Sequence, residues 1–303
     1  MRRARQAARR RRFVAVLVGA AALTAATLGT AWADQTPAPT PAPRVALPAP
    51  APASAAAPDL GALTGGGVHP GVQMRTAGAQ CTANFVYTGG GKTYLGQAAH
   101  CSGTGAADET DGCTAASLPL GTPVEISGAS KPGKLAYDSW LAMQGAHEKD
   151  PDACAYNDLA LVEIDPADVA AVTSSVPFFG GPVGIDTDGT TPGERVVSYG
   201  NSELRGGVPV LSPKIGTSLG DEGHGWSHTV ATVTPGIPGD SGSAFLSADG
   251  RALGVLSTLN FTPAPGTNSI GDLAKMLGYA RAHGAPGDLT VVNGGPFLGA
   301  SGL

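Results

Sequence analysis

Three residues of the chain have the types that nucleophilic acyl transfer requires. Ser241 lies in GIPGDSGSAF (236–245), where flanking glycines allow a tight turn that presents a small polar side chain. A serine hydroxyl is a weak nucleophile and needs a base to take its proton. His100, in QAAHC, is the candidate base, since imidazole titrates near neutral pH. Asp158 enters the alternating stretch DLALVEI, where an unpaired carboxylate is costly, and is the candidate partner of that imidazole.

Each motif also has an ordinary structural explanation. The glycine-framed serine is also common turn chemistry, the histidine can be structural or exposed, and the aspartate can face water at a strand edge. Taken together, in the chain order His, Asp, Ser, they supply a base, a residue to orient that base and a nucleophile.

The elements that must position these residues are predicted to be mostly β-strands. Short apolar runs recur with turn signals between them, a pattern typical of an all-β sandwich or barrel. The candidate strands are 85–89, 92–99, 122–126, 139–144, 159–164, 194–200, 228–233, 243–247, 252–259 and 289–292. One stretch, Ser269–Ala282, has apolar residues at a helical period and predicts a helix.

Four cysteines in an exported chain suggest two disulfides, with three possible pairings. Cys81 and Cys101 flank an apparent hairpin whose turn is Gly89-Gly90-Gly91, and opposite arms of a hairpin can meet disulfide geometry. This reasoning pairs Cys81 with Cys101 and leaves Cys113 for Cys154.

The N-terminal region is predicted to direct export rather than to fold. Residues 1–33 have seven arginines, an apolar run and an Ala-Trp-Ala cleavage site, as in a secretory signal peptide; an uncleaved anchor and a twin-arginine signal are the alternatives. Residues 34–67 are predicted to be a spacer or short pro-segment, because residues 36–58 alternate Ala and Pro. Loss of the seven arginines changes the net charge from −5 to −12, which argues against nucleic-acid partners, and no later stretch is apolar enough to span a bilayer.

In its three motifs the chain resembles the chymotrypsin-like serine proteases, especially the secreted bacterial members. The resemblance rests on A-A-H-C at 98–101, N-D-L-A-L at 157–161 and G-D-S-G at 239–242. It implies an all-β protease domain at 68–303 made of two packed six-stranded antiparallel β-barrels with a C-terminal helix. His100 and Asp158 would come from the first barrel, about 68–175, and Ser241 from the second, about 176–303.

The resemblance also implies roles for residues around the triad. The N–H groups of Gly239 and Ser241 would form the oxyanion hole, and Ser257 would support Asp158. Asp240 lacks the usual cationic partner, because no Ile-Val-Gly-Gly segment precedes Cys81 to supply a new N-terminal amine. Two arginines remain candidates for this role, Arg195 and Arg205.

The implied primary pocket has no charge. Its floor would lie near Pro235, and its wall would follow Thr258 and Leu259, with no acid in the stretch before Ser241. Such a pocket would favour small or medium apolar side chains on the acyl side of the cut bond.

The sequence therefore predicts a secreted, monomeric serine endopeptidase acting on protein or peptide substrates. Association with the cell envelope is an alternative to free secretion, since the spacer could hold the domain there. The alternatives are a catalytically idle binding or adhesion protein with the same fold, and an esterase using the same triad. No metal or other cofactor is expected, since the remaining histidines lack ligand spacing. Surface or loop positions are predicted for His69, His147, His224, His228 and His283.

Overall fold

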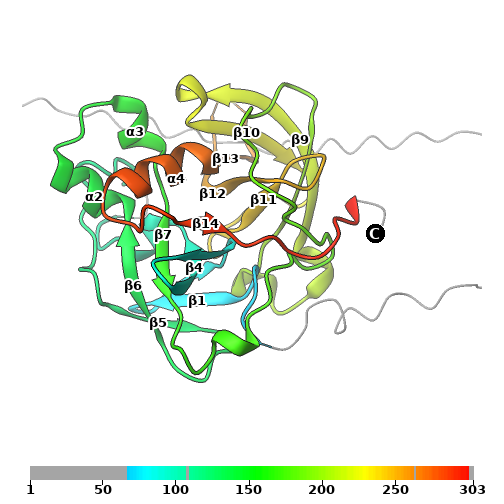
Figure 1. The fold of residues 1–303 in the computed structure, drawn as a ribbon. Coiled ribbons are helices and arrows are strands. Elements are labelled where there is room, and N and C mark those ends of the chain that lie inside the picture. The colour runs from blue at the N-terminus through cyan, green and yellow to red at the C-terminus, as the bar shows by residue number, and fades with distance from the viewer. Residues whose placement is uncertain (1–66, 107–108, 263, 300–303) are drawn as a thin grey trace, which may run out of the picture. The chain divides into compact units, whose positions relative to one another are not determined.

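The computed structural model describes residues 67–106, 109–262 and 264–299. The predicted signal peptide and nearly all of the predicted spacer lie outside these residues. The described part is mostly β-structure, and its strands form two antiparallel sheets (Figure 1). No helix in the described residues is long and apolar enough to cross a membrane.

The first sheet has eight strands in the order β14-β3-β4-β7-β6-β5-β1-β2. It has two strands more than the expected six-stranded barrel. One of them is β14, which the chain adds after the C-terminal helix, so that Val291 lies opposite Tyr87 of β3. The strands are β1 (Gln73–Thr76), β2 (Ala79–Thr82), β3 (Val86–Gly89), β4 (Lys92–Gln97), β5 (Pro123–Ile126), β6 (Gly133–Asp138), β7 (Ala160–Glu163) and β14 (Thr290–Val291).

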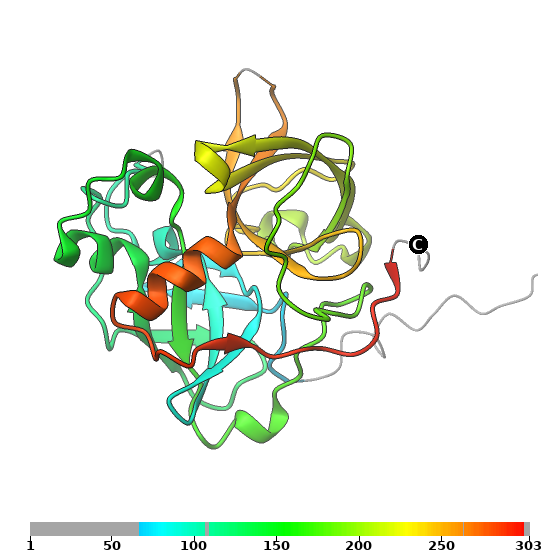
Figure 2. The same cartoon turned by 45° about the horizontal axis from the view of Figure 1, so that its top comes forward.

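The second sheet is the expected closed six-stranded barrel, with the order β10-β13-β12-β11-β8-β9. Figure 2 looks into this barrel. Because the barrel is closed, each of its strands pairs with a neighbour on both sides and no strand lies at a sheet edge along its whole length. The strands are β8 (Arg195–Tyr199), β9 (Pro213–Glu222), β10 (Ser227–Thr232), β11 (Ala244–Leu246), β12 (Ala252–Asn260) and β13 (Thr267–Asp272).

Two predicted elements differ from the structure. The expected strand 139–144 is instead helix α2 (Ser139–Ala146), because the Asp138 carboxylate caps the first turn and the apolar residues Trp140 and Met143 face the core three positions apart. The expected helix 269–282 starts later, as α4 (Leu273–Ala282), capped by Asp272. Residues 269–272 complete the barrel strand β13, whose pairing with β12 and β10 outweighs the local helical period. A further short helix, α3 (Pro151–Tyr156), was not predicted.

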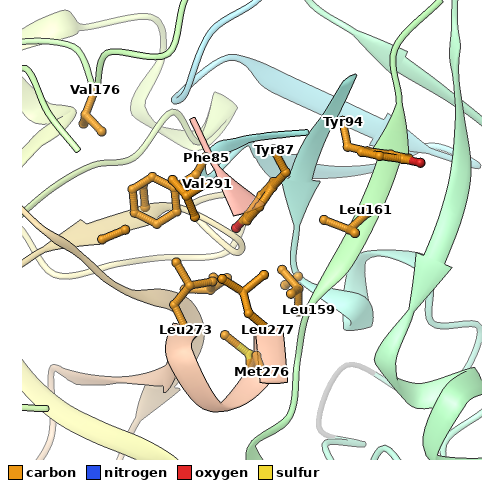
Figure 3. Packing of buried hydrophobic residues seen from close by; sticks show 14 of the residues in the cluster. Phe85, Tyr87, Tyr94, Leu159, Leu161, Val176, Leu273, Met276, Leu277 and Val291 are labelled. Atoms are coloured by element: carbon orange, nitrogen blue, oxygen red, sulfur yellow. The ribbon is translucent and has the colours of Figure 1, made fainter. Parts of the chain in front are cut away.

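Helix α4 packs where the two sheets meet. Its residues Leu273, Met276 and Leu277 lie against Phe85, Leu159 and other side chains of the first sheet (Figure 3). The same apolar cluster includes barrel residues such as Leu246 and Val255. This cluster therefore joins the helix to both sheets, and two further apolar clusters lie in the first sheet and in the barrel.

Both predicted disulfides are confirmed. Cys81 is bonded to Cys101, and Cys113 is bonded to Cys154. The reason given for the first was only partly right, since the hairpin consists of β3 and β4 alone. Cys81 belongs to β2, and Cys101 to the short 3-10 turn Ala99–Ser102 that follows β4, so the bond joins two segments that flank the hairpin.

Candidate active site

Asp158 holds His100 through two hydrogen bonds. The ring Nδ1 of His100 lies 2.7 Å from Oδ2 of Asp158, and the His100 backbone N–H donates to Oδ1 at 2.9 Å. The turn Ala99–Ser102 presents the histidine, and Asp158 immediately precedes β7, which pairs with β4. The carboxylate fixes both the backbone and the ring, so that the imidazole is held with Nε2 facing away from Asp158.

Ser257 gives Asp158 a third hydrogen bond. The Ser257 hydroxyl donates to Oδ2 of the carboxylate at 2.6 Å, from strand β12 of the barrel. Burial alone raises the pKa of Asp158, but His100 and these donors outweigh burial and hold that pKa below its usual value. Asp158 is therefore an anion linking the two sheets at neutral pH.

His100 titrates above its usual range. Burial lowers the pKa of the imidazole, but the neighbouring Asp158 carboxylate raises this pKa by more than burial lowers it, so the net shift is upward. The side chain remains 27% exposed, and no described residue hydrogen-bonds to its Nε2. That nitrogen is therefore accessible to take or return a proton near neutral pH.

The loop that carries Ser241 is anchored to β12 and to β2. The Gly242 N–H donates to the Leu256 carbonyl at 2.8 Å, and the Ser241 carbonyl accepts from the Thr82 N–H at 2.8 Å. Gly242 has φ +88°, and a Cβ there would lie 2.9 Å from the backbone nitrogen of Ala98. Only glycine allows this approach to the strand end that leads into the histidine turn.

Two backbone N–H groups of this loop have no acceptor within the described residues, and they belong to Gly239 and Ser241. Gly239 adopts φ +94°, and its carbonyl accepts from Gln80 Nε2 at 3.0 Å and Thr82 Oγ1 at 2.8 Å. The Gly239 N–H belongs to the peptide whose Pro238 carbonyl accepts from Ser202 Oγ at 2.6 Å, and the Ser241 N–H to the peptide whose Asp240 carbonyl accepts from the Ser243 N–H at 3.0 Å. These hydrogen bonds orient both peptides and leave the two N–H groups available for a negatively charged oxygen, as an oxyanion hole requires.

Asp240 is completely buried and pairs with two cations. One cation is Arg205, which was one of the two arginines considered in the sequence analysis. The other is Lys214 of β9, whose Nζ lies 2.9 Å from Oδ2 of Asp240. Arg195 is exposed at the start of β8 and is not a partner. Burial raises the pKa of Asp240, but both cations oppose it and bring that pKa below its usual value.

The predicted pocket residues lie in two different places. Thr258 lines a groove of about 590 Å³ beside Ser257, whereas Pro235 and Leu259 are not among the lining residues. The Pro235 carbonyl accepts from Arg205. Behind this region, the buried Asn268 amide bonds to both the N–H and the carbonyl of Gly236, and to the Thr258 carbonyl.

Several residues of the site region escaped the sequence analysis. Lys214 and Asn268 are ordinary strand residues in the sequence, and only the closed barrel brings them to Asp240 and Gly236. His228 was wrongly expected at the surface: it is fully buried on β10, between Asp221 at 2.6 Å and Asp272 at 3.0 Å. Its two-residue spacing from the buried Val230 was a signal that it faces inward.

The described residues offer no convincing metal site. Two clusters bring potential ligands within 4.8 Å of one another, one at His100 and one at Asp111, but each contains two cysteines. All four of these sulfurs are in disulfides and cannot act as thiolate ligands.

In comparisons with known proteins, the chain is similar to solved structures of bacterial chymotrypsin-like serine proteases. It is similar to Thermobifida fusca protease A, at 18% identity over 75% of this chain and 100% of that chain, with a TM-score of 0.48. A glutamic acid-specific serine protease is 19% identical over 74% of this chain and 100% of that chain, with a TM-score of 0.48. Nocardiopsis protease is 18% identical over 74% of this chain and 98% of that chain, with a TM-score of 0.44. No protein-family model and no curated protein matches the chain.

Proposed function

We propose that this chain is an exported serine endopeptidase that acts through Ser241, His100 and Asp158. The observation that carries the proposal is the triple hydrogen bonding of Asp158, twice by His100 and once by Ser257. This arrangement holds an imidazole with one nitrogen engaged and the other free, which is what a general base for a serine requires.

In the proposed reaction, Oγ of Ser241 attacks the carbonyl carbon of the peptide bond, and its proton passes to Nε2 of His100. The charge on the carbonyl oxygen is stabilised by the N–H groups of Gly239 and Ser241. His100 then gives its proton to the departing amine, which leaves an acyl-enzyme. Water attacks that ester with His100 again as base, and the acid product leaves as Ser241 recovers its proton.

The substrate residue on the acyl side of the cut bond is proposed to be small or medium and apolar. The amide of Asn268 has both polar atoms engaged by Gly236 and Thr258, so it offers no charge and no free donor to a substrate. Asn268 also occupies space between these two backbone segments, which favours Ala, Val or Leu over larger side chains. Profiling with a mixed peptide library tests this, and dominant cleavage after Arg, Lys or Glu would contradict it.

Export is supported by the chemistry of the described cysteines. Both disulfides fit an oxidising compartment, in agreement with the signal predicted from residues 1–33. We therefore propose that the protein is secreted and acts on extracellular protein or peptide substrates.

The triad is tested by the peptide hydrolysis rates of Ser241→Ala, His100→Ala and the double variant. Because the members of a triad act as one unit, each single variant should lose nearly all activity, and the double variant should be hardly worse. Losses that multiply in the double variant would contradict the assignment. No hydrolysis by the unaltered, folded protein would favour the idle binding protein instead.

A further inference from the structure

The groove beside Asp158 has features that the triad does not use. It begins at Ser257, follows β12 to Asn260, and is bounded by the ends of β9 and β10. Strands β10 and β13 pair beside the groove, with Ser227 opposite Gly271 and Val230 opposite Asn268. Since Ser257 contacts both the groove and the triad aspartate, a peptide cut at Ser241 can extend into this groove.

Two hydroxyl groups in the groove lining have no partner. The oxygens of Ser227 and Thr229 are buried, line the groove and have no hydrogen-bond partner among the described residues. Ser227 is only 1% exposed. A buried hydroxyl without a partner costs free energy, so these two groups indicate a ligand that supplies hydrogen bonds.

A carboxylate without a cationic partner lies next to these hydroxyls. Glu222 of β9 is directly opposite Ser227 of β10 and also lines the groove. Its only hydrogen bond in the described part of the chain is a long one of 3.5 Å from the Ser269 hydroxyl, and no described Lys, Arg or His forms a salt bridge with it. The adjacent Asp221 differs, because His228 already binds it at 2.6 Å.

The backbone beside this groove is also available to an extended peptide. On the β11 side, β12 is hydrogen-bonded as far as Leu256, which bonds to Gly242 and Ser243, and from Ser257 to Asn260 it pairs only with β13. A strand edge of this kind can bind a peptide by β-augmentation, with alternate side chains entering the neighbouring groove.

We propose that this groove binds a Lys or Arg side chain of the substrate, two to four residues before the cut bond on the acyl side. The carboxylate of Glu222 is its counterion, and the hydroxyls of Ser227 and Thr229 accept its remaining N–H groups. A cation fits better than a neutral donor, because the lining offers an uncompensated negative charge together with unpaired acceptors. The inference rests on the proposed peptidase function, which places the acyl side of the substrate along β12.

The test uses peptide substrates with Leu before the cut bond and either Arg or Gln at each of the three preceding positions. The unaltered protein should cleave the best Arg peptide about tenfold more efficiently than its Gln counterpart, mainly through a lower KM. Glu222→Gln should remove this preference, so that the Arg and Gln peptides are cleaved with equal efficiency. Glu125→Gln, on an exposed position of β5, is the matched control and should keep the preference.

An absent preference, or one that persists in Glu222→Gln, would overturn the inference. Peptide binding to Ser241→Ala, measured by fluorescence anisotropy, separates this result from a failure of the proposed function. Tighter binding of the Arg peptide that depends on Glu222 would support the groove assignment even if the unaltered protein hydrolysed no peptide. Equal binding of the two peptides would refute it, and matching melting temperatures would confirm that each variant folds.

Discussion

Removal of the negative charge of Asp240 should strongly destabilise the protein. The Asp240→Asn change keeps the shape of the side chain but leaves Lys214, which is completely buried, without its counterion. Asp240 also accepts hydrogen bonds from the backbone N–H groups of Ser202 and Ile237, so its loss disturbs the loop before Ser241. Breaking a buried ion pair by changing one partner typically costs about 3–5 kcal/mol. We expect a loss of this size in the free energy of unfolding, measured by urea denaturation at pH 7.

A double-mutant cycle tests whether the cost comes from an unpaired buried charge. Lys214→Met removes that charge, so Asp240→Asn combined with Lys214→Met should be more stable than the sum of the single losses predicts, by about 1–3 kcal/mol. Additive losses would refute the reasoning. The pKa of Asp240 is lowered in the folded state, so its contribution is present above about pH 3.8 and is lost as the pH falls through the folded-state pKa. The gap between wild type and Asp240→Asn should therefore narrow only in strong acid.

Two further predictions concern titration. Burial raises the pKa of Asp138 to about 7, so its ionisation destabilises the fold as the pH rises from about 4 to 7. Between pH 5 and pH 8, the free energy of unfolding of Asp138→Asn, measured by urea denaturation, should therefore increase by roughly 2–3 kcal/mol relative to that of wild type. A difference between the two proteins that does not change with pH would contradict this. The pKa of His100 is raised above its ordinary value of 6.5, and only the neutral imidazole can act as the base. The kcat/KM for peptide hydrolysis should therefore rise with pH through an apparent pKa above 6.5. A pH profile with its midpoint below 6.5 would contradict this.

The sequence was most informative where a local pattern decides the structure. The alternation in 159–164 predicted β7, and the glycine turn predicted the β3–β4 hairpin, since two-residue periodicity and turn chemistry act over a few residues. Local patterns failed at 139–144, where the deciding residue was the cap Asp138, and at 269–272, where barrel pairing took residues from the predicted helix.

For the site, residue types and chain order were enough to select His100 and Asp158, and the family resemblance pointed to Ser257. The structure joins all three through hydrogen bonds to the Asp158 carboxylate. Residues such as Lys214 and Glu222 were not found, because their significance depends on strands far apart in the chain. Lys214 meets Asp240 only across the closed barrel, and Glu222 meets Ser227 only through the register of β9 and β10. Contacts of this kind cannot be read from spacing along one sequence.

Labelling with a fluorophosphonate probe tests the central proposal most directly. The probe reacts with a serine only where a neighbouring base activates it and an oxyanion site stabilises the product. We expect peptide mapping to find one phosphonylated residue, Ser241, in the unaltered protein, and labelling to be nearly lost in folded His100→Ala. An unmodified Ser241 in folded protein, or labelling that does not depend on His100, would contradict the assignment of this site as a serine peptidase centre.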